Sequence, residues 1–231
     1  TALMIASQAG HEAIVEMLID KEADINAKHS DGSTALMMAS EAGHEEIVSA
    51  LIKAKANINA RSNNGDTALM MAIQEGHEAI VSALIDVKAN INAKNKNGVT
   101  PLMCASSSGH VAIAIVEKLI DKEADINATN SDGVTPLMCA SSSGHEEIVS
   151  ALIKAKANIN AKNKNGVTPL ICASLSGHEE IVSALIKAKA ETDVNDIDGF
   201  TAFINAKNND GFTPLMIASQ EGHTGIVSAL I

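Results

Sequence analysis

A segment of 33 residues repeats along this 231-residue chain. Each copy opens with threonine followed by Ala or Pro, and these threonines are Thr1, Thr34, Thr67, Thr100, Thr135, Thr168, Thr201 and Thr213. Successive copies are 33 residues apart, except for spacings of 35 after Thr100 and 12 after Thr201. A fixed period of this length is typical of proteins whose short repeats stack on their neighbours. We therefore predict a single repeat array over residues 1–231, with a truncated repeat at Thr201 and a partial one at Thr213.

The residues of one copy predict two short helices and a turn. In the copy that starts at Thr135, Pro136 suits the first turn of a helix, and Gly144 ends that helix. The sequence EEIVSALIK follows, and its apolar residues recur at the spacing of one helix face. Asn165-Gly166 then supplies the positive φ angles of a tight turn. Helices this short are unstable alone, so we predict an all-α repeat solenoid of stacked helix-turn-helix units with projecting β-hairpin loops.

This pattern resembles the ankyrin repeat, whose sequence runs D-x-x-G-x-T-P-L-H-x-A and then G-H-x-x-I-V-x-x-L-L-x-x-G-A-D-x-N. Here the first part reads, for example, DGVTPLMCA, and the second reads GHEEIVSALIKAKANIN. The resemblance covers nearly the whole chain. It implies an ankyrin-type stack with a concave face made by the hairpin tips and the first helices. It also implies that the protein binds other proteins without catalysing a reaction.

Two positions depart from the ankyrin pattern. The histidine of T-P-L-H is replaced by Met or Ile. The glycine after the second helix is replaced by Glu22, Lys55, Lys88, Glu123, Lys156 and Lys189. A left-handed conformation costs a residue with a side chain roughly 1 kcal/mol relative to Gly. We predict positive φ at most of these residues, because this is where a helix of this kind ends in a left-handed cap.

The copy at Thr100 contains two extra residues. His110 lies five residues before Ile115, whereas the equivalent distance in the other copies is three. Two residues inside a helix would turn its apolar side by about 200°. We therefore expect the insertion before the second helix or in its first turn. Ile113 then either contacts a partner or packs against the neighbouring copy.

The copy at Thr201 is shorter than the others by most of a helix pair. TAF runs directly into INAK, so that 21 residues are absent relative to the first copy. A deletion of this size would leave two apolar faces with nothing between them, and we expect that a segment is missing between Phe203 and Ile204. Because Thr1 and Ile231 both fall inside a copy, we also expect the array to be part of a longer one that continues at both ends.

The composition excludes several classes of function. The chain has 17 Lys and Arg against 28 Asp and Glu, a net charge of −11. This is the wrong sign for binding nucleic acid or an anionic membrane surface. No apolar run approaches the roughly 18 residues of a membrane-spanning helix, so we expect no membrane insertion. Three cysteines are too few for a disulfide framework and predict a reducing, intracellular location, either free in the cytoplasm or on the cytoskeleton.

The residues that are able to carry chemistry are themselves repeated. Seven of the eight histidines follow a glycine, one in each copy except the truncated copy at Thr201. Neighbouring copies lie roughly 10 Å apart, too far to share a metal ion bound at about 2 Å. We interpret these histidines as bracing the second helix. Cys104, Cys139 and Cys172 recur at spacings of 35 and 33, which is typical of small buried residues. An active site needs a unique nucleophile and base in one pocket. We predict no enzymatic activity, no metal site and no cofactor.

The positions that differ from copy to copy lie at the hairpin tips and just before each Gly-His pair. Any one of them is as readily explained as ordinary solvated surface. Taken together they are the best candidate site, and the predicted partner-binding residues are Lys28, His29, Asp31, Arg61, Asn63, Lys94, Lys96, Ser107, Ser108, Thr129, Asp132, Ser142, Ser143, Lys162, Lys164 and Leu175. The leading hypothesis is a non-catalytic module that binds another protein across these residues. The alternative is a scaffold or spacer segment within a large assembly, for example a cytoskeletal one.

Overall fold

The computed structural model of the chain describes residues 1–108, 113–192 and 197–231. These residues form two compact bodies, the N-terminal body (Thr1–Ala124) and the C-terminal body (Asp125–Ile231). Fifteen α-helices and no strands lie in the described ranges. The predicted all-helical class is confirmed, and the predicted hairpins are loops closed by turns instead of strands. The single array over residues 1–231 stays a prediction.

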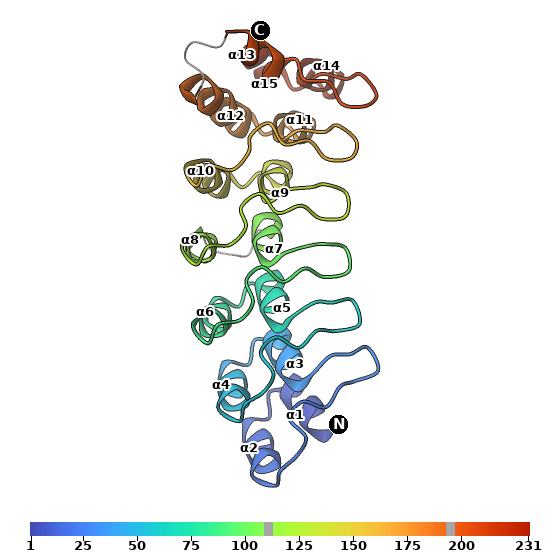
Figure 1. Ribbon diagram of the computed structural model, residues 1–231, viewed down its shortest axis with the longest axis vertical. Coiled ribbons are helices and arrows are strands. Elements are labelled where there is room, and N and C mark those ends of the chain that lie inside the picture. The colour runs from blue at the N-terminus through green and yellow to red at the C-terminus, as the bar shows by residue number, and fades with distance from the viewer. Residues whose placement is uncertain (109–112, 193–196) are drawn as a thin grey trace. The chain divides into compact units, whose positions relative to one another are not determined.

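The N-terminal body is built from helix pairs. The first helices of the pairs are α1 (Ala2–Ala9), α3 (Ala35–Ala42), α5 (Ala68–Glu75) and α7 (Pro101–Ser107). The second helices are α2 (Glu12–Asp20), α4 (Glu45–Lys53), α6 (Glu78–Asp86) and α8 (Ile113–Asp121). First helices pack against first helices and second helices against second helices, which gives the two columns seen in Figure 1. Each pair therefore covers the apolar side of the pair before it, as the repeat pattern predicts.

The C-terminal body follows the same plan with one additional helix. Its first helices are α9 (Pro136–Ser143), α11 (Pro169–Ser176) and α14 (Pro214–Glu221). Its second helices are α10 (Glu146–Lys154), α12 (Glu179–Thr192) and α15 (Thr224–Leu230). The additional helix, α13 (Ile197–Ile204), packs against α12.

The threonine that opens each repeat fixes the start of the first helix. In α3, the Thr34 hydroxyl accepts a hydrogen bond from the Met37 N–H at 3.4 Å, and the glycine that ends the helix, Gly43, has φ 81°. These two caps satisfy backbone groups that would otherwise lack partners at the helix ends. Between them, Leu36 is 1% exposed, and in the paired helix Ile47 and Leu51 are exposed by 1% or less. Burial of each such side chain contributes about 1.5–3 kcal/mol.

The predicted left-handed residues after the second helices are confirmed at five of the six positions. The φ angles lie between 58° and 66° at Glu22, Lys55, Lys88, Glu123 and Lys156. The exception is Lys189, which lies inside α12 because this helix continues to Thr192. The chain thus keeps the ankyrin-type reversal with a strained residue in place of glycine.

The truncated copy at Thr201 forms no helix pair of its own in the described range 197–231, because α13 ends at Ile204 and the next helix begins at Pro214. α14 packs directly on α11, and α15 packs on α12, so the repeat at Thr213 stacks on the repeat at Thr168. The expected gap is also absent from the described chain, because α13 runs through Phe203 and Ile204, and the Asn205 N–H donates to the Thr201 carbonyl at 3.1 Å. The additional residues are accommodated beside the stack, so no apolar face is left uncovered between α11 and α14.

The two extra residues of the copy at Thr100 lie before its second helix. α8 begins at Ile113, so Ile115 is its third residue, as Ile148 is the third residue of α10. The insertion therefore falls among residues 109–112, outside the described residues, and it leaves the register of α8 unchanged. Ile113 itself is half-buried.

Candidate binding surface at the loop tips

The loop that follows each second helix ends in a tight turn. In the loop at Lys28–Asp31, the Gly32 N–H donates to the His29 carbonyl at 2.9 Å, and the His29 N–H donates to the Ser33 carbonyl at 2.8 Å. The Asp31 carboxylate accepts a further hydrogen bond from the Ser33 N–H at 2.8 Å. Gly32 has φ 82°, which explains why glycine follows Asp or Asn in these loops. Figure 1 shows the loops projecting from the column of first helices, away from the second helices.

Neighbouring loops are joined by backbone hydrogen bonds. The Asn63 N–H donates to the Asp31 carbonyl of the preceding loop at 2.7 Å. The same bond recurs within the two bodies at 2.8 to 2.9 Å, from Lys96 to Asn64, from Lys164 to Asp132 and from Asn209 to Asn165. In each body the tips therefore form a row whose spacing is fixed by the backbone.

Two cations of the predicted site take part in this loop-to-loop bonding. The Lys28 ammonium donates to the Arg61 carbonyl at 3.0 Å. The Arg61 guanidinium donates to the Gly65 carbonyl at 3.2 Å and also to the Lys94 carbonyl. Their long side chains reach the loop 33 residues further on, which charge patterns in the sequence do not reveal. Lys28 and Arg61 thus hold the row together as well as lining it.

The structure places the predicted binding residues in two groups in each body, and all of them are exposed except the half-buried Ser108. One group occupies the loop tips, with Lys28, His29, Asp31, Arg61, Asn63, Lys94 and Lys96 in the N-terminal body and Thr129, Asp132, Lys162 and Lys164 in the C-terminal body. The other group lies at the ends of first helices, with Ser107 and Ser108 at α7, Ser142 and Ser143 in α9, and Leu175 in α11.

His29 and Asp31 form a polar pair at the tip of the first loop. The His29 Nδ1 and Asp31 carboxylate oxygen are 3.1 Å apart. The hydrogen bond from the Ser33 backbone lowers the pKa of the Asp31 carboxyl, with a smaller contribution from His29. Asp31 therefore stays ionised near neutral pH and presents a negative charge beside the tip lysines.

The repeated histidines brace the preceding repeat instead of their own helix. His44 is the N-cap residue of α4, but its side chain makes no capping bond there. Its Nε2 instead donates to the Gln8 carbonyl of α1 at 3.1 Å. A Cβ added to Gly10 would lie 2.6 Å from the His44 ring, so the glycine makes room for the imidazole of the next repeat. The same arrangement recurs for His77 on Glu41, His178 on Ser142 and His223 on Leu175.

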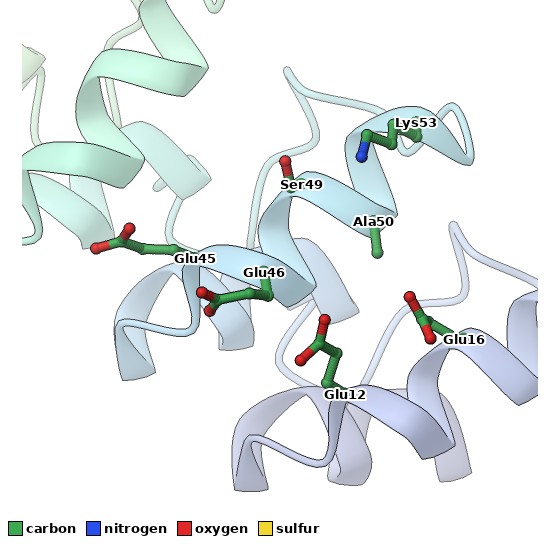
Figure 2. A pocket seen from close by; sticks show the side chains of 7 residues that line it. All are labelled: Glu12, Glu16, Glu45, Glu46, Ser49, Ala50 and Lys53. Carbon is green, nitrogen blue, oxygen red and sulfur yellow. The ribbon is translucent and has the colours of Figure 1, made fainter.

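A shallow groove on the second-helix side is acidic. It lies between α2 and α4, and Figure 2 shows the carboxylates of Glu12, Glu16, Glu45 and Glu46 along it, with the Lys53 amine further along α4. Glu12, Glu45 and Glu46 lie in the first turns of second helices, where negative charge stabilises the helix dipole. The groove is open, and the lining residues place no histidine beside the Ser49 hydroxyl, so they show no paired nucleophile and imidazole base.

Cys139 and Cys172 are largely buried and form no disulfide. Burial raises the pKa of Cys139 to about 11 and that of Cys172 to about 12, so both are protonated near neutral pH. Within the described residues no group of three or more His, Cys, Asp or Glu side chains is arranged to hold a metal ion. In the same part of the chain, no helix has the length and apolar character to span a membrane.

Stacked helix pairs with protruding loops define a class of helical repeat protein. A comparison with protein families agrees, because the family model for ankyrin repeats (3 copies) matches residues 1–62, 54–130, 112–198 and 163–231. The chain therefore belongs to the ankyrin-repeat family. A search of curated proteins gave no match to this sequence. Ankyrin repeats are generally protein-interaction modules, and they are typically non-catalytic.

Proposed function

We propose that the chain is a non-catalytic module that binds another protein across the loop tips and the adjoining ends of the first helices. The observation that carries this proposal is the row of loops joined by backbone hydrogen bonds, from Asp31 through Asn63 and Lys96 in the N-terminal body. A surface that is ordered before binding loses little conformational entropy when a partner arrives. The loops therefore favour recognition of an extended surface.

The side chains on this row differ from one loop to the next. The loop at Arg61–Asn64 carries one cation, the loop at Lys94–Asn97 carries two, and the loop at Thr129–Asp132 carries an anion. The backbone beneath them is nearly constant, because each loop repeats the same turn. Variable side chains on a constant backbone give a partner-specific surface, which is how repeat proteins achieve specificity.

The chemistry of the described residues supports a binding role over catalysis. The thiols of Cys139 and Cys172 have raised pKa values, so they are poor nucleophiles. Four of the repeated histidines donate to backbone carbonyls of the preceding repeat: His44, His77, His178 and His223. Cys139 and Cys172, which form no disulfide, also support an intracellular, reducing location.

Charge reversal at the tips tests the proposal on a partner isolated with the intact chain. In one variant Lys96, Lys162 and Lys164, which are exposed at the tips, are changed to Glu. In the matched control Lys53, Lys55 and Lys156, exposed at or just after the ends of second helices, are changed to Glu. We expect the tip variant to weaken binding at least tenfold and the control to leave it within about twofold, as measured by titration calorimetry.

Equal affinity of both variants and the parent chain would refute the loop-tip surface. That result would favour the alternative role as a spacer, which does not require exposed charges at the tips. Because all six substituted lysines are exposed, we expect the helices of both variants to remain intact. Far-ultraviolet circular dichroism of each variant checks this.

A further inference from the structure

Some loop tips carry an asparagine directly before the glycine of the turn. These asparagines are all exposed, and they are Asn64, Asn97 and Asn165. The backbone nitrogen of a residue is able to attack the side-chain carbonyl carbon of an asparagine that precedes it, and glycine hinders this attack least because it has no side chain. At other tips the same position holds a carboxylate, from Asp31, Asp132 and Asp210. An amide at the tip is therefore replaceable by an acid within this fold.

The fold requires the glycine that leaves these asparagines open to attack. Gly65 has φ 84°, and an added Cβ would lie 3.0 Å from the Cα atom of Asn95 in the next loop. Gly166 has φ 73°, and an added Cβ would lie 3.0 Å from the backbone nitrogen of Asn209. A residue with a side chain would strain the turn and push the neighbouring loop away. The close approach of the loops thus excludes the bulky residue that would block the attack.

In the closed loop, the attacking nitrogen is engaged in a hydrogen bond. The Gly65 N–H donates to the Ser62 carbonyl at 2.9 Å, and the Gly166 N–H donates to the Asn163 carbonyl at 3.0 Å. Attack requires that this nitrogen loses its proton, so the hydrogen bond of the turn must break first. The reaction therefore proceeds from a transiently opened loop, at a rate that follows the population of the open form.

Arg61 adds two hydrogen bonds that hold one of these loops closed. Its guanidinium donates to the carbonyl of Gly65 itself at 3.2 Å, and also to the Lys94 carbonyl of the next loop. The equivalent residue in the loop of Asn165 is Lys162, which has no counterpart of these bonds among the described residues. Removal of the Arg61 side chain therefore favours opening of the Asn64 loop alone.

We propose that Asn64, Asn97 and Asn165 are sites of deamidation, and that the hydrogen bonds that close the loops set its rate. The glycine nitrogen forms a bond to the asparagine Cγ and gives up its proton, the Cγ–Nδ2 bond breaks, and ammonia leaves behind a cyclic imide. Water then opens the imide at either of its carbonyls, which gives aspartate or isoaspartate. The net reaction consumes water and releases ammonia, without a change in oxidation state.

The two products affect the row of loops differently. The Asn64 carbonyl accepts a hydrogen bond from the Lys96 N–H at 2.8 Å, and the Asp132 carbonyl accepts one from the Lys164 N–H at the same distance. Aspartate at position 64 therefore keeps this bond and adds only a negative charge. In isoaspartate the main chain runs through the former side chain and gains a methylene. The carbonyl that accepts from Lys96 then belongs to a free carboxylate, and Gly65 is displaced from the next loop.

Peptide mass spectrometry on the intact folded chain, after incubation in mildly alkaline buffer, tests the proposal. In the parent chain we expect the mass increase of an amide-to-acid conversion at the three Asn-Gly pairs, and none at Asn57, which Ile58 follows. Arg61→Ala should raise the rate at Asn64 by about fivefold or more, since loss of one typical hydrogen bond changes an opening equilibrium by about that factor. The rate at Asn165 in the same samples should not change.

Two controls separate loop opening from other causes. Lys162→Ala removes a long side chain at the equivalent position and should leave the rate at Asn165 within about twofold of the parent. Unfolding in guanidinium chloride should abolish the difference between Arg61→Ala and the parent, because the loops are then open in both. Circular dichroism checks that the helices of both variants remain in buffer. The absence of conversion at the Asn-Gly pairs, an equal or lower rate at Asn64 in folded Arg61→Ala, or an effect of Arg61 that persists in the denaturant would each overturn the proposal.

Discussion

The close contact between each Gly-His glycine and the histidine of the next repeat predicts a large effect of a single methyl group. In Gly43→Ala, the added Cβ would lie 2.5 Å from the Cε1 atom of His77, closer than real Cβ contacts. The ring must move, and its hydrogen bond of 3.0 Å to the Glu41 carbonyl is lost. In addition, φ at this position is 81°, which disfavours alanine.

The backbone strain and the lost hydrogen bond each lower the free energy of unfolding by an amount that can be estimated. The left-handed backbone costs alanine about 1–2 kcal/mol, and loss of the histidine bond costs about 0.5–1.5 kcal/mol. We therefore expect Gly43→Ala to lower the free energy of unfolding by about 1.5–3.5 kcal/mol. The measurement is a urea titration followed by circular dichroism.

A double-mutant cycle isolates the contact. In a His77→Ala background the methyl group meets no ring, so Gly43→Ala should cost only the backbone part, about 1–2 kcal/mol. Gly222→Ala is a second comparison, because φ there is 78° and no atom of the described residues lies within 4 Å of the added Cβ. If Gly43→Ala costs the same with and without His77, the histidine does not brace the preceding repeat and the reasoning fails.

Three further predictions concern single side chains. Lys55→Gly should raise the free energy of unfolding by about 1 kcal/mol in a urea titration, because Lys55 has φ 64°, and an unchanged value would contradict left-handed strain. Ser40→Ala should also stabilise the chain, by about 1 kcal/mol in thermal unfolding, since the Ser40 hydroxyl is buried without a hydrogen-bond partner among the described residues; destabilisation would reveal a partner. In a Cys104→Ala variant, alkylation of Cys139 and Cys172 should still accelerate about tenfold per pH unit between pH 9 and 10; a plateau near pH 9 would show that burial does not raise their pKa values to about 11 and 12.

The sequence predicted the parts of the fold that depend on neighbouring residues. Threonine caps, glycine ends and apolar periodicity act within one helix pair, so alignment of the copies was enough to predict them. The positive φ at Lys55 and its equivalents was predictable for the same reason. Lys189 does not have a positive φ, because α12 continues past it. The sequence KAKA surrounds both Lys156 and Lys189, so only the residues that follow KAKA distinguish the two positions.

The sequence predicted that neighbouring copies stack, but not which helix pair stacks on the copy at Thr168. At Thr201 the motif resembles the start of a repeat, but the next complete helix pair begins at Thr213, and it is this pair that covers α11 and α12. Packing depends on complementary apolar faces, which a single short motif does not contain. Similarly, the position of His44 was evident, but its contact with Gly10 depends on the direction of the ring in space.

The candidate site came from the sequence as a set of variable positions, and the hydrogen bonds between the loops were not predicted. The backbone ladder from Asp31 to Asn63 has no sequence signature apart from the Asp-Gly and Asn-Gly turns. The bonds from Lys28 and Arg61 depend on side chains that span two loops. The sequence identified Lys28 and Arg61 only as charges at the tips, whereas in the structure their side chains also join neighbouring loops.

The segment that contains α13 adds residues to the chain without adding a helix pair to the stack. α14 lies on α11 although 12 more residues precede it than a regular repeat would allow. Residues inserted at this point should therefore lengthen the polypeptide without changing the number of stacked helix pairs. A grafted epitope or a fluorescent label placed there would decorate the protein's flank while leaving the order of its layers intact.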